Sequence, residues 1–455
     1  MKKIFLLISA CLCLEKNISA QSHWTQCTTS IGVISAVAAI GDTILASSTS
    51  SGIYFSTDSG ITWARRDTNT TRIVRTLITS GNDIYAGSGG GLSGIVAIYK
   101  SSDFGWTWTD VSPAGMVSGS YVKTLAVNST DIFAGLSGAT GTTGVVKSPL
   151  SGISTSSWAN FSNGLTSQAI YSLQISGTNI YAGSYGKGVF ISPTANANWT
   201  STSGMQINSE FISSISVNGS DVYAGNASGY PALYHSTNGG ANWAQSSTFS
   251  FLNKQVGSVI TDGTNIFAGT DGIGVMLSTN SGQNWFQWNT GFLDNAGNWY
   301  CNGITVYSML IKGTTMYAAT DCGVWKRSTS TSCFASVSDS IYKDPSQPLT
   351  WDIIPNYSPQ VTSAEWFWGD GTSTTGLYPS HTYATTGWYT ISTKAYASCG
   401  DSSSFITSDS IYRVSGSNAM ITANVIQNPT VVNQISATNN HVSVFPNPGK
   451  GSVTI

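Results

Sequence analysis

A short hydrophobic motif that returns seven times constrains this chain more than any other feature of its sequence. In its commonest form the motif is an apolar residue, an aromatic residue, Ala and Gly. Its copies begin at Ile44, Ile84, Ile132, Ile180, Val222, Ile266 and Met316. Successive copies are 40, 48, 48, 42, 44 and 50 residues apart. A period of this length indicates a repeat architecture in which each unit is one supersecondary element.

Within one repeat unit, short alternating segments indicate four β-strands. Residues 170–199 contain "IYSLQIS", "IYAGS", "GKGVFIS" and "NWTST", separated by turn residues. Alternation of apolar and polar residues is typical of a strand with one buried face. Charged residues make up only 9% of the chain, and this composition also favours strands and turns over helices. The sequence therefore predicts an all-β fold with a seven-bladed β-propeller over residues 24–330.

A Trp follows each of the first six copies at a similar offset, and this pattern predicts how the ring closes. These residues are Trp63, Trp108, Trp158, Trp199, Trp243 and Trp285. No Trp follows the seventh copy at the expected place, but "HWTQC" at 23–27 precedes the first unit and has no inner strands before it. We therefore expect the segment around Trp24 to supply the outer strand of blade seven, which removes the exposed sheet edges.

The chain after its N-terminal leader contains five cysteines, which permit two disulfides. Alignment of the N-terminal segment and of blade seven on blade one places Cys27 across from Cys322. A disulfide there would latch the ring, and the loop-entropy argument gives about 4–5 kcal/mol for so long a loop. A Cys301–Cys322 bridge inside blade seven is the alternative. Cys333 and Cys399 bracket the segment after the propeller and are candidates to bridge its ends.

Four related stretches predict a repeated turn on the outer side of the blades. They are "STDSGITW" at 56, "SSDFGWTW" at 101, "STNGGANW" at 236 and "STNSGQNW" at 278, and they contain Asp58, Asp103, Asn238 and Asn280. Asp and Asn side chains accept hydrogen bonds from backbone N–H groups a few residues later. Because Asn replaces Asp in two copies, we interpret these positions as structural turn acceptors and not as catalytic carboxylates.

These stretches resemble Asp-box (BNR) repeats, and residues 24–330 are similar to sialidase-like and photosystem-assembly-factor-like propellers. The resemblance implies the propeller fold and a structural Asp box. In sialidases it would also imply a catalytic Arg triad, a Tyr–Glu pair and an Asp acid. The arginines of the ring are Arg65, Arg66, Arg72, Arg75 and Arg327, and its single glutamate is Glu210. Four of the arginines fall near the junction of blades one and two, so a triad gathered from several blades is not expected.

A second enzymatic interpretation is an endoglucanase-like propeller that uses paired aspartates as acid and base. Asp271 and Asp321 follow two of the repeated motifs in "GTDGIG" and "ATDCGV", where they are candidates for the rim of the central channel. Trp288, Trp299 and Tyr300 precede blade seven and are candidates to stack on a sugar ring, although core packing is the simpler role. We therefore assign no catalytic residue and keep Asp271 and Asp321 as candidates only.

The sequence lacks the residue patterns expected for metal binding, for nucleophilic or nucleotide-dependent enzymes and for nucleic-acid binding. The four histidines are scattered over different units, so no metal-ligand spacing is present. No Gly-x-Ser-x-Gly elbow, P-loop or dinucleotide fingerprint occurs, and we expect no cofactor and no metal. The net charge is −2 without a basic run, which argues against nucleic-acid binding.

The repeat ends near residue 330, and a second domain is expected at 333–415. The motifs "WFWGDG", "HTY" and "GWYTIS" occur there in order and resemble a PKD domain, an immunoglobulin-like β-sandwich. Trp366 and Trp368 alternate along a strand, so we expect one of them to fill the core. Asp370 is expected as a turn acceptor, with a metal or ligand contact as the alternative. Residues 416–440 are expected to form a linker or to contain a weak extra strand.

The two ends of the chain suggest export. Residues 1–20 resemble a signal peptide with a cleavage site after Ala20, and lipidation at Cys11 is the alternative. No later window is apolar for long enough to span a bilayer. Residues 441–455 contain "FPNPGKG" and look like the truncated start of a type IX secretion C-terminal sorting domain. We therefore expect a secreted or surface protein of a Gram-negative bacterium.

The resulting hypothesis is a monomeric exported binding or adhesion protein. Its propeller would present a surface for an extracellular protein or glycan, and the type IX secretion machinery would be a further partner. The alternative is a secreted glycoside hydrolase or lyase acting in the propeller channel. A channel lined by Ser, Thr and aromatic side chains would favour binding, whereas a pocket lined by two carboxylates would favour hydrolysis.

Overall fold

The structure is a computed structural model that describes most of residues 23–425. The described ranges are 23–27, 31–66, 73–89, 97–114, 121–138, 144–167, 169–205, 211–228, 232–246, 254–292, 303–331, 335–343, 350–384, 387–398, 402–413 and 421–425. Every regular element in these ranges is a β-strand. The all-β fold is therefore confirmed. The segments expected to be a signal peptide (1–20) and a sorting domain (441–455) lie outside the described residues.

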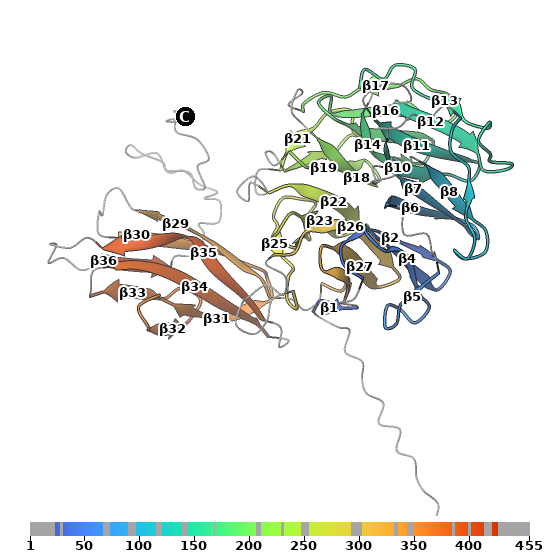
Figure 1. Ribbon diagram of the computed structural model, residues 1–455. Helices are drawn as coiled ribbons and strands as arrows, with labels where there is room; N and C mark the ends of the chain where they lie inside the picture. Colours follow the sequence, from blue (N-terminus) through green and yellow to red (C-terminus); the bar gives the residue numbers. More distant parts are fainter. Residues whose placement is uncertain are drawn as a thin grey trace, which may run out of the picture. The chain divides into compact units, whose positions relative to one another are not determined.

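The propeller region contains seven four-stranded antiparallel sheets, which are the seven predicted blades (Figure 1). Blades one and two are β2 (Ile34–Ile40), β3 (Thr43–Ser48), β4 (Gly52–Ser56) and β5 (Ala64–Arg65), then β6 (Val74–Ser80), β7 (Asp83–Ser88), β8 (Ile98–Ser101) and β9 (Thr109–Asp110). Blades three and four are β10 (Tyr121–Val127), β11 (Asp131–Ser137), β12 (Gly144–Pro149) and β13 (Ala159–Asn160), then β14 (Ile170–Ser176), β15 (Asn179–Ser184), β16 (Val189–Pro193) and β17 (Thr200–Ser201). Blades five and six are β18 (Ile212–Asn218), β19 (Asp221–Asn226), β20 (Leu233–Ser236) and β21 (Ala244–Gln245), then β22 (Val256–Thr261), β23 (Ile266–Thr270), β24 (Val275–Ser278) and β25 (Phe286–Gln287).

Blade seven joins the two ends of the propeller sequence. It contains β26 (Val306–Lys312), β27 (Thr315–Thr320) and β28 (Gly323–Ser328), and its outer strand is β1 (Thr25–Gln26). The innermost strands contact one another in the order β2, β6, β10, β14, β18, β22 and β26, and β26 contacts β2 again. The ring is therefore closed, and the prediction that the N-terminal strand completes blade seven is confirmed.

Packing between adjacent blades explains the Ala-Gly motif. A Cβ atom on Gly183 would lie 2.6 Å from a methyl group of Ile212, the first residue of the next blade's inner strand. The corresponding glycine of blade three, Gly135, would meet Ile170 at 2.9 Å. Contacts this short leave no room for a side chain, so the glycine lets the neighbouring blade approach closely.

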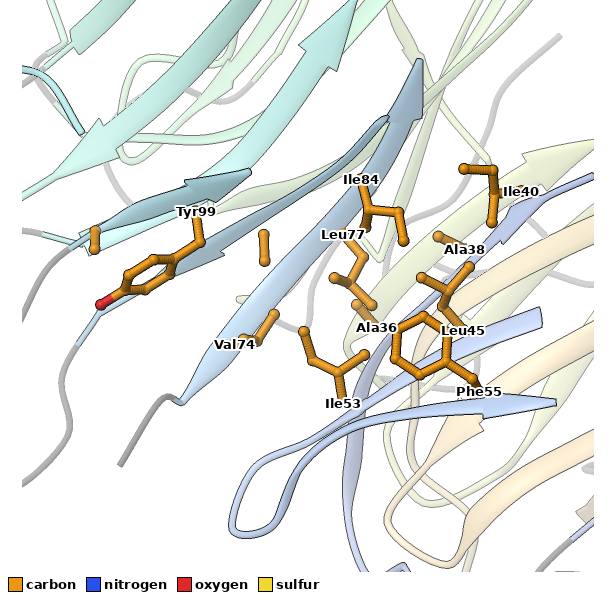
Figure 2. Close-up of a cluster of buried hydrophobic side chains, with 12 residues drawn as sticks. Ala36, Ala38, Ile40, Leu45, Ile53, Phe55, Val74, Leu77, Ile84 and Tyr99 are labelled. Atoms are coloured by element: carbon orange, nitrogen blue, oxygen red, sulfur yellow. The ribbon is translucent and has the colours of Figure 1, made fainter. Parts of the chain in front are cut away.

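Apolar side chains fill the interface between adjacent blades, as the cluster between blades one and two illustrates (Figure 2). Leu45, Ile53 and Phe55 of blade one face Val74 and other residues of blade two in that view. All four are nearly inaccessible to solvent. Burying a side chain of this size is worth about 1.5–3 kcal/mol, so seven such interfaces provide the main stabilisation of the ring.

The repeated Trp links each blade to the one before it. Trp199 of blade four donates from Nε1 to the Phe161 carbonyl of blade three at 2.6 Å. Trp24 links blade seven to the segment that follows blade six. Its backbone N–H donates to the Thr290 carbonyl at 2.7 Å, and its ring stacks on Phe292 with the ring centres 4.7 Å apart. The outer Trp is therefore a wedge at the blade boundary, including the boundary where the chain closes on itself.

The expected Cys27–Cys322 latch is wrong. Cys27 carries a free thiol, whereas Cys322 forms a disulfide with another cysteine. The alignment on blade one is correct, but the register differs from the expected one: the Cys27 N–H donates to the Val324 carbonyl at 2.7 Å, two residues beyond Cys322. The Cys27 side chain packs among apolar residues between blades seven and one, and burial raises the pKa of its thiol to about 12. Cys301, Cys333 and Cys399 lie outside the described residues.

The second unit consists of two four-stranded sheets. One contains β29 (Val337–Lys343), β30 (Thr350–Tyr357), β36 (Ile421–Val425) and β33 (Ser380–Tyr383), in that order. The other contains β32 (Ser373–Thr375), β31 (Val361–Phe367), β34 (Gly387–Ala397) and β35 (Ser402–Arg413). Because β36 pairs with both β30 and β33, the segment 416–440 contributes a strand, which is the second of the two expected alternatives, and the second unit extends past residue 415. Membership of the PKD family stays a prediction.

The core of the second unit corrects one further expectation. Trp366 and Trp368 are both fully buried and stack at 6.0 Å, whereas we expected only one of them inside. Residues two apart point to the same face of a strand, and the intervening Phe367 is exposed. Asp370 accepts hydrogen bonds from the Thr372 N–H and hydroxyl and lies 2.7 Å from His381 Nε2, so it links its own turn to β33, which contains His381.

Candidate ligand-binding site in the propeller channel

Every blade has the same irregularity at the start of its innermost strand. The regular pairing of the first two strands shifts by one residue there, which is the mark of a β-bulge. The bulged residues are Ser35, Arg75, Lys123, Tyr171, Ser213, Gly257 and Tyr307. A bulge redirects its side chain out of the regular alternation, so each blade contributes one chemically variable residue at an equivalent place.

These seven residues surround one cavity in the centre of the ring. The cavity has a volume of about 210 Å³. Its remaining lining comes from the same inner strands and consists mainly of Ser, Thr and aliphatic residues, among them Thr124, Ser172, Ser258 and Ser308. Its lining, as far as the described residues define it, contains no carboxylate. The cavity is therefore a polar site with aromatic and cationic groups.

Two cations from adjacent blades form one side of this cavity. Lys123 Nζ lies 4.6 Å from the centre of the Tyr121 ring and 4.8 Å from the Tyr171 ring. The Arg75 guanidinium lies 5.6 Å from the same Tyr121 ring, and its Nε donates to the Gly89 carbonyl at 3.0 Å. Burial, together with the charge of Arg75, lowers the pKa of Lys123. The aromatic rings hold both cations in place through cation–π contacts.

Two carboxylates, from blades six and seven, lie close together near Tyr307. Asp271 follows β23 of blade six, and its Oδ1 accepts a hydrogen bond from Thr305 Oγ1 at 2.9 Å. Asp321 follows β27 of blade seven, and its Oδ1 accepts from the Thr305 N–H at 3.2 Å. Thr305 directly precedes β26 and stands two residues before Tyr307, which lines the cavity, whereas neither Asp271 nor Asp321 is a lining residue. The position of the two carboxylates at the channel rim stays a prediction.

The local electrostatics follow from the closeness of the two acids. Burial raises the pKa of Asp321, and the charge of Asp271 raises it further. Burial likewise raises the pKa of Tyr307, to which the negative charges of Asp321 and Asp271 add. The Tyr307 hydroxyl therefore stays protonated and able to donate a hydrogen bond, and its side chain is 44% exposed.

The four Asp-box positions lie far from this chemistry, in the turns between the third and fourth strands. Asp58 accepts hydrogen bonds from the Ser56 hydroxyl at 2.8 Å and from the Thr62 N–H at 2.8 Å. The Thr62 hydroxyl bonds the same carboxylate and is the main reason that the pKa of Asp58 falls to about 2. Asp103, Asn238 and Asn280 accept the equivalent bonds from the residue four positions later at 2.9 Å. In all four blades the side chain therefore organises a turn.

Other residues singled out from the sequence do not gather at the cavity. Trp288 is fully buried and cannot stack on a ligand, while Trp299 and Tyr300 lie outside the described residues. Arg66 bonds the Phe104 carbonyl at the outer edge of the blades, and Arg327 is buried within blade seven. Arg72 and Glu210 lie outside the described residues, so the expected absence of a sialidase-type set is tested only for the other arginines.

The seven bulged residues that surround the cavity, here called the bulge ring, can be located from a sequence pattern that the sequence analysis did not use. An Ile or Val stands ten residues before each of the seven repeated motifs, and the bulged residue follows it directly. Each of these Ile and Val side chains is nearly inaccessible. The next position in the seven repeats is Ser, Arg, Lys, Tyr, Ser, Gly and Tyr, so the residue varies although the apolar residue before it is always Ile or Val.

Two further findings limit the chemistry of the described residues. They contain no group of three His, Cys, Asp or Glu side chains placed to hold a metal ion. They also contain no helix with the length and apolar character needed to cross a membrane.

Comparison with known proteins supports the fold. No protein-family model matches the chain, and no curated protein matches it. Among solved structures, YCF48 bound to D1 peptide is 13% identical with a TM-score of 0.50, and the match covers 67% of this chain and 96% of that one. The GH74 xyloglucanase from Xanthomonas campestris is 14% identical with a TM-score of 0.51, covering 71% and 58%.

A third likeness extends further along the chain. The extracellular domain of a hybrid two-component system from B. thetaiotaomicron is 15% identical with a TM-score of 0.53. The match covers 88% of this chain and 48% of that one, so this chain spans about half of its length. The chain is a β-propeller protein. At these identities the likenesses define the propeller fold and leave the activity open.

Proposed function

We propose that this protein is an exported binding protein whose propeller channel takes the ligand. The observation that supports this proposal most directly is the bulge ring: one variable residue from each of seven blades faces a single cavity. A concave site with aromatic groups and a few placed polar groups is the usual form of a ligand pocket. Export, through the leader at residues 1–20 and a type IX signal at 441–455, is part of the proposal.

The chemistry of the lining favours binding over hydrolysis. Ser, Thr and Tyr supply hydrogen-bonding groups, and Tyr171 and Tyr307 offer ring faces. Neutral hydroxyls and aromatic faces recognise polar ligands without activating water. YCF48, one of the similar propellers, has been solved with a bound peptide, and a protein or glycan ligand is the corresponding proposal for this chain.

A specific observation keeps a second candidate function, glycoside hydrolysis. Asp271 and Asp321 both bond Thr305, so their carboxyl groups lie close to each other beside the cavity. Most glycosidases use a pair of carboxyl groups for catalysis, and a GH74 xyloglucanase is among the proteins with a similar fold. The raised pKa of Asp321 would suit an acid that donates a proton.

Binding and turnover assays separate the two functions. Purified protein is tested on glycan and peptide arrays, and polysaccharides are screened for hydrolysis. Two channel variants, Tyr171→Ala and Tyr307→Ala, are compared with Trp106→Ala, whose side chain is 65% exposed on an outer turn. We expect binding without turnover, at least tenfold weaker in the channel variants and unchanged in Trp106→Ala. Turnover that disappears in Asp321→Asn would replace the binding proposal with the hydrolase.

A further inference from the structure

The charges around the cavity are separated by blade. Arg75 and Lys123 belong to blades two and three, whereas Asp271 and Asp321 belong to blades six and seven. In a closed ring of seven blades the midpoints of these two pairs are four positions apart in one direction and three in the other, and the nearest members, in blades two and seven, are separated by blade one. Arg75 and Lys123 line the cavity itself. Asp271 and Asp321 are not part of the lining but lie next to the lining residue Tyr307, so the site has a positive pole in the cavity and a negative pole beside it.

Neither pole is neutralised by an ion pair within the described part of the chain. The ion pairs found there are Lys100–Asp83, Lys147–Asp131, His235–Asp221, Lys312–Asp42 and His381–Asp370. The four charged residues beside the cavity belong to none of them. Two adjacent like charges are unfavourable to hold together, and a ligand group of opposite charge at each pole would relieve that cost.

Small residues leave the space between the poles open. Ser35, Ser213 and Gly257 occupy the bulge positions of blades one, five and six. Tyr171 lies beside the positive pole and Tyr307 beside the negative pole. A ligand that spans the cavity would thus meet an aromatic ring at each end and short side chains along its middle.

We propose that the channel binds a zwitterionic ligand, with its anionic group at Arg75 and Lys123 and its ammonium group at Asp271 and Asp321. This inference rests on the proposed function, because it names the ligand class of the same cavity. A neutral sugar would use neither pole, and a polyanionic glycan would be repelled by the carboxylates. A compound with a carboxylate at one end and a protonated amine at the other fits both poles and the open middle.

Capped oligoglycines provide matched probes for this proposal. Triglycine is zwitterionic, N-acetyl-triglycine has only the carboxylate, and triglycine amide has only the ammonium group. Diglycine and tetraglycine vary the distance between the charges. In titration calorimetry at low salt, where electrostatic attraction is strongest, we expect one zwitterionic oligoglycine to bind at least tenfold more tightly than both of its capped forms.

Charge-neutral variants assign each pole. Arg75→Ser with Lys123→Ser should abolish the preference for the zwitterion over the amide, and Asp271→Asn with Asp321→Asn should abolish the preference over the N-acetyl form. Lys100→Gln removes a cation from an ion pair outside the cavity and should change neither preference. Thermal unfolding checks that each variant is folded, and the comparison of the three probes on the unaltered protein decides the question even if a double variant does not fold.

Three outcomes would overturn the inference. Equal binding of triglycine and its capped forms would show that charge at both ends is not read. Binding of the N-acetyl form alone would leave an anion site without the second pole. Absence of binding by any oligoglycine, with a glycan or protein still bound in the array experiment, would remove the zwitterion proposal and keep the binding function. Failure in both experiments would remove both.

Discussion

The outer edge and the inner edge of each blade share one strand plan, yet their side chains vary in opposite ways. At the outer edge, six blades carry Trp in their own sequence and the seventh receives Trp24. At the inner edge, the bulge occurs in all seven blades but its residue changes from Ser to Arg, Lys, Tyr or Gly. Repetition of one chemistry marks a structural requirement, while variation on a fixed backbone marks a site that is free to specialise.

The comparison predicts that changes at the outer edge affect stability and changes at the inner edge affect binding. Four experiments sharpen it, in order of decreasing effect on stability.

Replacing Trp24 should cause the largest loss. Trp24 is 1% exposed and stacks on Phe292, so Trp24→Ala leaves a cavity at the closure of the ring. We expect a loss of about 3–5 kcal/mol in unfolding free energy, measured by chemical denaturation. Trp106→Ala serves as the control for Trp removal at an exposed site and should cost much less. Equal losses in the two variants would contradict the closing role of Trp24.

The second experiment tests the close approach of the chain to Trp24. Gly291 has a φ of 98°, and a Cβ atom there would lie 2.1 Å from the Trp24 carbonyl oxygen. Gly263 has the same φ of 98° with nothing within 4 Å. Both alanine variants carry the same backbone strain, so the difference between them isolates the clash. We expect Gly291→Ala to be less stable than Gly263→Ala by about 1–3 kcal/mol, and similar stabilities would show that the closure tolerates a shift.

The third experiment uses the Asp-box turn. Asp58→Asn keeps the acceptor that Asn238 supplies in blade five and should leave the melting temperature almost unchanged near neutral pH. Asp58→Ala removes the acceptor and should lower it by a few degrees.

The pH dependence of the same site has a defined sign. The folded pKa of Asp58 is lowered to about 2, chiefly by the Thr62 hydroxyl. The stabilisation is therefore complete above the ordinary carboxyl pKa of about 4 and is lost as the pH falls toward 2. The stability gap between wild type and Asp58→Ala should shrink over this range in thermal melts, whereas a constant gap would contradict the carboxylate's role.

The smallest effect on stability is expected at the inner edge. Arg75→Ser installs the residue that blades one and five carry at the equivalent position. It also relieves the repulsion that lowers the pKa of Lys123. We expect unfolding free energy to change by no more than about 0.5 kcal/mol, while ligand binding changes strongly. A large loss of stability would mean that the inner residues are structural as well.

Sequence periodicity predicted the blades and the closing strand because both depend on local patterns. Alternating residues define strands, and the missing seventh Trp pointed to Trp24. Register was harder to predict: the alignment of Cys27 was correct, but its pairing with Val324 joins two strands that no turn connects, so no local pattern determines it. A displacement of two residues was enough to turn an expected disulfide into a buried thiol.

The candidate site was only partly predictable for a related reason. Asp271 and Asp321 were identified by their place after two motifs, yet their meeting at Thr305 requires two blades to be adjacent in space. Arg75 was assigned to the approach to blade two, but the structure places it on the innermost strand. Bulges change where a side chain points without changing the hydrophobic pattern, so periodicity alone did not reveal the ring of seven residues.

Closure by the N-terminal strand has a kinetic consequence. Gln26 bonds the Cys322 carbonyl across 296 residues of chain, so blade seven has the most non-local pairing in the propeller. Contacts of such separation form slowly because a large loop must close first. During synthesis from the N-terminus, β1 therefore has no partner strand until residues 323–328 have been made. Pairing of β1 with β28, the last step of folding, can therefore occur only after the sequence of all seven blades has been made.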